Sequence, residues 1–532
     1  MFKRMFLKKT IAQIQHEASH TGLKRTLGKW NLVSLGIGCI IGAGIFVMTG
    51  TAAAQHAGPA IILSFVFTGI ACAFVGLCYA ELASLLPISG SAYTYAYATL
   101  GEVFAWVMGW LLLLEYGVAA STVAVGWSGY INSFLLGFHV MIPPELTMAT
   151  NQVITVTEVF RDQFIAKGYT FAADGTLLTA AGTAVLGIFN LPAFLGIIMV
   201  GTLLVVGVSE SAKVNNVIVF IKLLVVIMFV GIGFFYVDPA NWHPFIPKQT
   251  APGVYGWDGI FRAASIIFFA YVGFEAVSTA AQEAKDPQKD MPFGILGSLL
   301  ICTILYMGVA AVLTGIVKYP ALNVADPMAV AVDTIGLGWF AFVIKIGAIT
   351  GLSSVMLVLM YGQTRIFYTM SADGLLPRSL SKLHPKFKTP YINTIIVSVI
   401  VALAAGVTPI SLLGDLVSLG TLLAFIIVCF TVLYLRKVEP NMPRPFRTPG
   451  APVTPVLGIL TCGYLVYSIF FGNDAAGHIV LTESGTKVLQ YTGPYVIVGA
   501  LIYLFYGIRH SRLYRDKLPH VIKTELTPPE KL

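Results

Sequence analysis

The first long apolar run of the chain contains the stretch Gly36-Ile37-Gly38-Cys39-Ile40-Ile41-Gly42-Ala43-Gly44-Ile45-Phe46. Each of its four glycines weakens an α-helix by about 1 kcal/mol relative to alanine. Irregular backbone at membrane depth persists only where it lines a cavity or is buried in protein. The stretch therefore predicts a broken membrane helix beside a site. The alternative is close helix packing, because Gly38 and Gly42 have small-xxx-small spacing.

A second interruption lies in the sixth apolar run, at Phe268-Phe269-Ala270-Tyr271-Val272-Gly273-Phe274-Glu275. Two glycine-interrupted spans at corresponding positions of two halves indicate the binding site of a transporter. The amide groups freed at a half-helix N-terminus suit a carboxylate, and freed carbonyl groups suit an ammonium. The pair of interruptions therefore predicts a receptor for a zwitterion.

Composition places the whole chain in a membrane. Of 532 residues, 57% are hydrophobic and only 11% are charged, against roughly 25% charged in soluble domains. This composition excludes a soluble protein and a disordered one. A spanning helix needs about 20 mostly apolar residues, which gives about twelve candidates and an all-α membrane protein. They are 31–55, 59–86, 102–135, 183–208, 214–237, 257–282, 292–317, 337–368, 391–407, 411–436, 454–473 and 490–508.

The positions of the basic residues predict the orientation. Loops on one predicted side, together with both chain ends, carry 25 of the 33 Lys and Arg residues, the opposite side carries 7, and Lys222 lies within a span. Basic loops remain in the cytoplasm, so a basic arm (1–30) and a tail (509–532) are predicted to be cytoplasmic. The net charge of +8 is then a topology signal and does not indicate a nucleic-acid partner.

The sequence contains none of the common residue patterns of enzyme active sites. All six cysteines fall inside apolar stretches without metal-ligand spacing, so we expect no disulfide-linked partner and no metal. No nucleotide-binding, zinc-protease or serine-hydrolase motif is present. The sequence therefore predicts neither an enzyme nor a cofactor.

Three ionisable residues lie deep inside predicted spans, where a charge is costly. Lys222 is a candidate proton carrier, or a fixed cation where other transporters bind sodium, with Ser353 and Ser354 as candidate oxygen partners; the alternative is a stem that snorkels to the interface. Glu115 either faces the cavity or pairs with a neighbouring helix. Glu275 either lines the pocket or caps the second half-helix.

Several motifs together resemble one family. They are Leu27-Gly28-Lys29-Trp30-Asn31 before Gly42-Ala43-Gly44-Ile45-Phe46, Tyr79-Ala80-Glu81-Leu82, the break at 269–275, Thr279-Ala280-Ala281-Gln282-Glu283, and Asp286-Pro287. As a set they resemble the amino acid–polyamine–organocation (APC) superfamily, most closely its bacterial cationic amino acid transporters, over roughly residues 25–510.

The resemblance implies a LeuT-type fold with alternating access: spans 1–5 (31–237), an inverted repeat of spans 6–10 (257–436), two further helices (454–508), and broken first and sixth helices. It implies that one group of residues holds the substrate carboxylate and that the carbonyls of a second group hold its amino group. Lys222 matches a lysine that replaces sodium in proton-coupled relatives, and Glu115 matches an acid of bacterial relatives. Glu275 departs from the aspartate often found there. The residues implied to hold the substrate carboxylate are Ile41, Gly42, Ala43 and Gly44. The residues whose carbonyls are implied to hold the substrate amino group are Phe269, Ala270 and Val272.

The expected function is secondary active import of cationic or small neutral amino acids across a bacterial inner membrane, by proton symport. The expected partners are the amino acid, protons and membrane lipid. An exchanger of amino acids or polyamines and a transporter-like sensor remain alternatives. A channel is disfavoured because the spans hold too few polar residues to line a continuous pore.

Overall fold

The structure is a computed structural model that describes residues 7–8, 27–86, 91–156, 158–172, 175–207, 212–281, 283–474 and 477–513. Most of the predicted arm (1–30) and tail (509–532) therefore lies outside the described residues. The described chain is mostly helical. Nine of its helical runs are long and apolar enough to cross a membrane, and Leu191–Val206 and Tyr391–Val407 are shorter apolar helices.

The first half of the chain contains most of the irregular helices. The helices are α3 (Lys29–Ile40), η1 (Gly44–Met48), α4 (Thr49–Ala52), η2 (Ala53–Ala57), η3 (Gly58–Ala60), α5 (Ile61–Leu85), α6 (Ser91–Thr99), α7 (Glu102–Leu136), η4 (Pro144–Leu146), η5 (Glu158–Phe160), α8 (Arg161–Ile165), α9 (Leu191–Val206), α10 (Ala212–Gly233), η6 (Phe234–Tyr236) and η7 (Pro239–Trp242). Strands β1 (Thr170–Phe171) and β2 (Leu177–Leu178) form an antiparallel hairpin, with Thr170 opposite Leu178.

The second half begins with another broken helix. Its helices are α11 (Gly256–Ile267), η8 (Phe268–Tyr271), η9 (Glu275–Ala280), α12 (Pro287–Ile316), η10 (Tyr319–Leu322), α13 (Pro327–Ile335), α14 (Gly338–Ala372), η11 (Arg378–Ser381), α15 (Tyr391–Val407), α16 (Ile410–Val438), α17 (Val453–Phe470), α18 (Glu483–Ile502), η12 (Tyr503–Gly507) and α19 (Ile508–His510). Strands β3 (Phe471–Asn473) and β4 (Ile479–Leu481) pair antiparallel, with Phe471 opposite Leu481.

Both glycine-rich stretches interrupt their helices, as the sequence predicts. Helix α3 ends at Ile40, and Ile41 has an extended backbone (φ −72°, ψ 98°) before the chain resumes as the π-helical turn η1. Helix α11 ends at Ile267 and narrows to the 3₁₀ turn η8. Gly273 then has φ +118°, which only glycine adopts without strain. The two irregular segments pack against each other.

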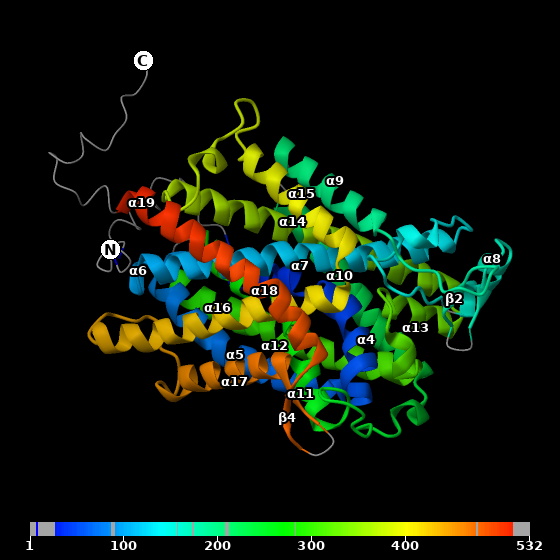
Figure 1. Cartoon of the computed structure of the whole chain (residues 1–532). Helices are drawn as coiled ribbons and strands as arrows, with labels where there is room; N and C mark the ends of the chain where they lie inside the picture. The colour runs from blue at the N-terminus through cyan, green and yellow to red at the C-terminus, as the bar shows by residue number, and fades with distance from the viewer. Residues whose placement is uncertain are drawn as a thin grey trace.

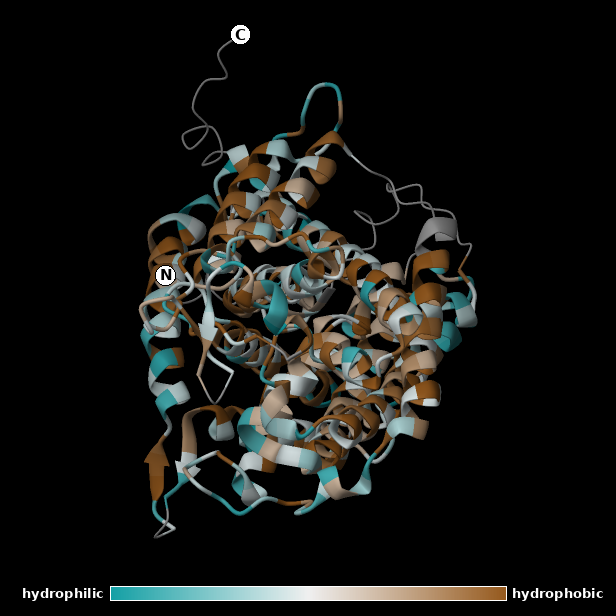
Figure 2. Ribbon diagram, turned by 90° about the vertical axis from the view of Figure 1, so that its right-hand side faces the viewer, coloured by the Kyte–Doolittle hydropathy of each residue, from teal (hydrophilic) through white to brown (hydrophobic). Residues whose placement is uncertain are grey.

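Two long helices form the centre of the bundle. Helices α7 and α14, each of 35 residues, run side by side (Figure 1), and α16 packs against α7. Helix α12 packs on α5 and α3, and α9 packs on α15. Figure 2 shows hydrophobic residues over most of the helices. Large apolar side chains such as Val496 and Phe505 on the last helical run are more than half exposed, as expected of a surface that lipid covers.

The edges of two predicted spans differ from the structure by seven or more residues. The span predicted to begin at 183 begins at Leu191, where the Asn190 side chain accepts a hydrogen bond from the backbone of Ala193 and caps the helix. The apolar residues before it belong to a small outer unit with its own core, which includes Phe164, Leu177 and Val185. The span predicted to begin at 490 begins seven residues earlier, at Glu483.

A buried ion pair joins α11 to α16. The guanidinium of Arg262 lies 2.6 and 2.7 Å from the two carboxylate oxygens of Asp415, and both side chains are at most 5% exposed. Removing one partner of a buried pair leaves an uncompensated charge and costs about 3–5 kcal/mol, whereas an apolar pair of similar volume is often tolerated.

We therefore expect Asp415→Ala to lower the thermal unfolding temperature of the purified protein clearly. The double variant Arg262→Met/Asp415→Leu is expected to recover most of that loss. Unfolding of the detergent-solubilised protein, followed by intrinsic fluorescence, measures both. A single variant as stable as the parent would contradict this role for the pair.

Candidate functional site

The two broken helices touch at Gly44 and Ala270. A Cβ atom on Gly44 would lie 2.2 Å from Cα of Ala270, so the two backbones are in direct contact. The hydroxyl of Tyr306 on α12 lies 2.8 Å from the carbonyl oxygens of both Ile40 and Ala270. Because it has one proton, it donates to one carbonyl at a time and links the ends of the two breaks. The sequence does not predict this role for Tyr306, since a tyrosine inside an apolar run carries no signal.

The structure brings together the residues predicted from the two breaks. Ile41 to Gly44 are buried, and a Cβ on Gly42 would lie 3.2 Å from a γ-carbon of Val355 on α14. Two of the three predicted carbonyls already accept hydrogen bonds: that of Phe269 from the backbone of Val272 (3.1 Å), and that of Ala270 from Tyr306. A carbonyl oxygen accepts two bonds, so each retains capacity for a ligand.

Glu275 binds the backbone of the second break. One of its carboxylate oxygens accepts from the backbone N–H of Gly273 at 2.8 Å, and the other from the hydroxyl of Tyr116 at 3.4 Å. A Cβ on Gly273 would lie 2.8 Å from the carbonyl carbon of Cys39, so the second break also presses on α3. The side chain is 3% exposed. These bonds connect Glu275 to the backbone of the break and to α7, and no side-chain hydrogen bond caps η9 itself.

Glu115 lies in a cluster of buried polar groups. Its side chain is fully buried, and neither carboxylate oxygen has a hydrogen-bond partner among the described residues. The hydroxyls of Thr421 and Tyr79 are also buried without a partner within the described chain. Buried polar groups are nearly always bonded to protein or to ordered water. The cluster therefore identifies a place for water or for a polar ligand beside the broken helices.

Lys222 reaches the end of the first half-helix. Its ammonium donates to the carbonyl oxygen of Gly38 at 2.9 Å, and its stem packs against Gly351 on α14. The side chain is fully buried, which disfavours the snorkelling alternative.

Ser354 lies one turn beyond Gly351 on α14. The hydroxyl of Ser353 instead accepts from the indole of Trp127 at 2.9 Å and donates to the carbonyl of Ile349.

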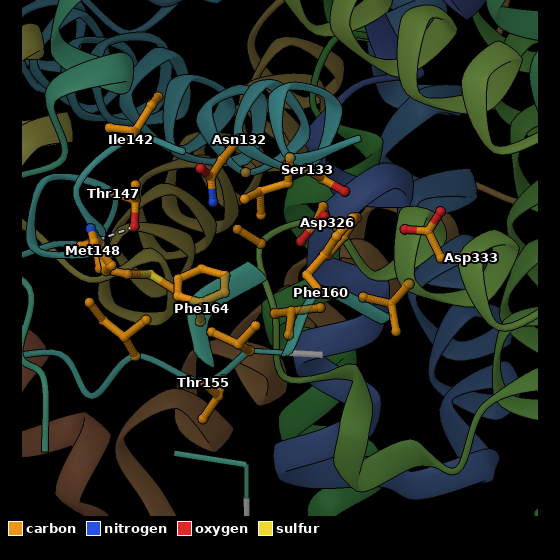
Figure 3. A pocket seen from close by; sticks show the side chains of 18 residues that line it. Asn132, Ser133, Ile142, Thr147, Met148, Thr155, Phe160, Phe164, Asp326 and Asp333 are labelled. Carbon is orange, nitrogen blue, oxygen red and sulfur yellow. Dashed lines mark hydrogen bonds between the residues drawn. The ribbon is translucent and has the colours of Figure 1, made fainter. Parts of the chain in front are cut away.

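A pocket lies at the end of the bundle opposite α6, between the end of α7, the outer unit and α13 (Figure 3). Asp326 and Asp333 line it on one side, and Phe164 and Met148 on the other. Lys345 donates to both carboxylate oxygens of Asp333, at 2.8 and 2.9 Å. Burial raises the pKa of Asp326 to about 6, although the nearby charge of Lys345 opposes the shift. A hydrogen bond from the side chain of Ser133 to the Asp326 carboxyl group also opposes the rise in its pKa.

Because the pKa of Asp326 is raised in the folded protein, the stability of the protein is expected to depend on pH. The unfolded carboxyl group loses its proton near pH 3.8 and the folded one near pH 6. Folding therefore takes up a proton between these values, and this group's contribution to stability falls as the pH rises through the window. We expect Asp326→Asn to raise the unfolding temperature at pH 8 and to leave it unchanged near pH 4. An equal gain at both pH values would contradict the assignment.

Comparison with known proteins identifies the family of this chain. The profile of the amino acid permease family matches residues 27–501. This chain belongs to the amino acid permease family. Its relatives include the branched-chain amino acid permease BcaP of Bacillus subtilis (strain 168), which is 43% identical over 96% of this chain and 99% of the relative.

Two further relatives of this permease are named for other substrates. The methylthioribose transporter of the same organism is 41% identical over 96% of this chain and 99% of its own length. The vacuolar cationic amino acid transporter 4 of Arabidopsis thaliana is 35% identical over 80% of this chain and 66% of its own length. The predicted resemblance to the APC superfamily is confirmed. The protein is a multi-pass membrane transporter of the permease family.

Proposed function

We propose that this permease imports amino acids across the bacterial inner membrane by alternating access, coupled to protons. The observation that carries the proposal is the contact of the two helix breaks at Gly44 and Ala270, with the ammonium of Lys222 on Gly38 directly before the first break. Such a pair of broken helices is the usual binding site of secondary transporters.

We infer twelve spans in a LeuT-type arrangement. Nine long apolar runs and two shorter apolar helices occur in the described chain. The run Gly44–Leu85 is 42 residues long, about 63 Å at 1.5 Å per residue and roughly twice a bilayer core. It turns at Gly58, where φ is +61°, and so contributes to two spans. The inverted repeats (31–237 and 257–436), the additional helices (454–508) and cytoplasmic termini complete this proposal.

The substrate we propose is an amino acid with an uncharged side chain. Its carboxylate would meet Ile41, Gly42, Ala43 and Gly44, and its amino group the carbonyls of Phe269, Ala270 and Val272. Val355 lies against Gly42 and gives this side of the site an apolar wall. Relatives from Bacillus subtilis and Lactococcus lactis bear the name branched-chain amino acid permease, which supports a neutral substrate over a cationic one.

The proton would act through Lys222 and Glu115. A buried ammonium at the end of the first half-helix supplies a fixed positive charge, which disfavours a sodium ion at the same place. Loss of its proton would weaken the bond to the Gly38 carbonyl, because a charged donor binds more strongly than a neutral amine, so protonation and the position of α3 are coupled. Glu115 is a second candidate, because its buried carboxylate has no partner among the described residues, while Ser354 is better placed than Ser353 to assist Lys222.

Uptake into proteoliposomes tests the proposal. An inward proton gradient without sodium is imposed, and labelled leucine, alanine, lysine, a polyamine and methylthioribose are compared. We expect accumulation of a neutral amino acid that collapses when an uncoupler is added. Exchange without accumulation would replace symport by antiport, and uptake of methylthioribose alone would overturn the amino acid assignment. Absence of any flux from a folded protein would favour a sensor.

A further inference from the structure

The last described residues of the chain are held inside the protein. Ile508, Ser511 and Leu513 are each at most 5% exposed, although segments near chain ends are usually poorly ordered unless other elements hold them. They follow the turn η12, in which Tyr503 is also buried. We name residues 503–513 the clasp. Figure 1 shows α19, which is part of the clasp, at the same end of the bundle as α6.

The clasp binds the carboxylate at the start of α7. Glu102 is 1% exposed and accepts hydrogen bonds from three hydroxyl groups, those of Tyr97 (2.9 Å), Tyr503 (3.4 Å) and Ser511. Two of these donors belong to the clasp and one to α6. Glu102 is therefore a common anchor for both segments.

The clasp also binds the end of α14. The backbone N–H of Arg512 donates to the carbonyl oxygen of Asp373 at 2.9 Å, while the Asp373 carboxylate accepts from the hydroxyl of Tyr93 at 2.8 Å. A Cβ on Gly374 would lie 2.3 Å from the carbonyl oxygen of His510, so the two backbones touch. Clasp and α6 therefore share a second anchor.

Helix α6 connects these anchors to the broken sixth helix. It bears Tyr93 and Tyr97, which are bonded to Asp373 and Glu102, and it packs against η9 and α16. The turn η9 begins at Glu275, directly after the second break, and also packs against α3. Any displacement of α6 therefore acts on the inner halves of both broken helices.

We propose that the clasp is a regulatory restraint on the face of the bundle that we assign to the cytoplasm. While Ser511 and Tyr503 bind Glu102, α6 is fixed to the ends of α7 and α14, and the path between the broken helices and this face stays closed. Release of the clasp frees α6 and favours opening toward the cytoplasm. The inference rests on the proposed alternating access, but the contact it concerns uses none of the residues of the proposed substrate site.

A native cysteine reports on this opening without any transport. Cys39 is partly exposed, and the other five cysteines are buried free thiols. It lies in α3 against Gly273 and close to both Lys222 and Glu275. A membrane-impermeant maleimide, added only on the side of the membrane that the α6 end of the bundle faces, therefore measures how readily Cys39 is reached from that side. The variant Cys39→Ser supplies the background from the buried thiols.

The decisive variant is Ser511→Asp, which sets a second carboxylate against Glu102 and expels the clasp by repulsion. We expect Cys39 to be labelled several-fold faster in this variant, and moderately faster in Ser511→Ala and Tyr503→Phe, which each remove one hydroxyl donor. The matched control is Ser381→Asp, which adds the same charge on the same face. Its hydroxyl bonds to the carbonyl of Arg378 within the turn η11 and to no other described residue.

Equal labelling rates in the folded Ser511→Asp variant and the parent would overturn the clasp. If Ser511→Asp does not fold, the two single-hydroxyl variants decide, and unchanged labelling in both overturns it. Faster labelling in Ser381→Asp as well would also overturn it, because charge alone would then explain the effect. Since labelling needs no substrate, a negative uptake experiment leaves this test intact.

Discussion

Replacing Lys222 by alanine is expected to abolish proton-driven accumulation of substrate and to lower the initial uptake rate by about 10–150-fold. A hydrogen bond from a charged donor is worth about 1.5–3 kcal/mol, which corresponds to that range. The fully buried ammonium of Lys222 donates to the carbonyl of Gly38 at 2.9 Å, so its removal loosens the end of α3 as well as eliminating the titrating group. Initial uptake rates at pH 5.5 and 7.5 measure both effects.

Two further variants separate charge from hydrogen bonding. Lys222→Gln retains a donor and lacks the charge, so we expect it to exchange substrate without accumulating it. Lys318→Ala removes an exposed lysine and should behave as the parent protein. Normal uptake and an unchanged pH profile in Lys222→Ala would show that this lysine has no part in coupling.

The sequence predicted that Lys222 is important but did not reveal its partner. A lysine surrounded by apolar residues within a span is costly by itself, so its depth was visible from local sequence. The Gly38 carbonyl is 184 positions away along the chain, and only the fold brings the two together. Ser353 and Ser354 were equally plausible partners for a related reason, because adjacent residues on a helix point about 100° apart and sequence does not fix which of them faces Lys222.

Helices were easier to predict than the contacts between them. Both breaks were visible because glycine clusters weaken helices. The edge near 183 was wrong because apolar residues of the outer unit resemble span residues in composition. The edge near 490 was wrong for the opposite reason, because the first turns of α18 carry polar residues such as Glu483 and Lys487. The sequence indicated that Glu275 lies at the second break, but it did not indicate which side chains contact the two breaks. Tyr116 and Tyr306 each bond to a break from another helix, a role that depends on long-range packing.

The second large effect is expected at Gly44. Substitution by alanine places a Cβ 2.2 Å from the backbone Cα of Ala270, a distance that the two broken helices can relieve only by moving apart. Overpacking of a tight core contact costs about 1–3 kcal/mol. We therefore expect Gly44→Ala to lower the unfolding temperature and to abolish uptake, because the displaced segments form the proposed site. Thermal unfolding and uptake are measured on the same preparation.

Two other glycines show whether it is the contact at Gly44 that matters. Gly463 on α17 has open space where a Cβ would lie, so Gly463→Ala should keep transport and gain up to about 1 kcal/mol from helix propensity. A Cβ on Gly42 meets only the methyl groups of Val355, at 3.2–3.3 Å. Gly42→Ala should therefore remain nearly as stable as the parent and yet bind substrate more weakly, because the added methyl group occupies the site itself. If Gly44→Ala transported normally, the contact between the two breaks would not be needed for function, and the proposed site would have to lie elsewhere in the bundle.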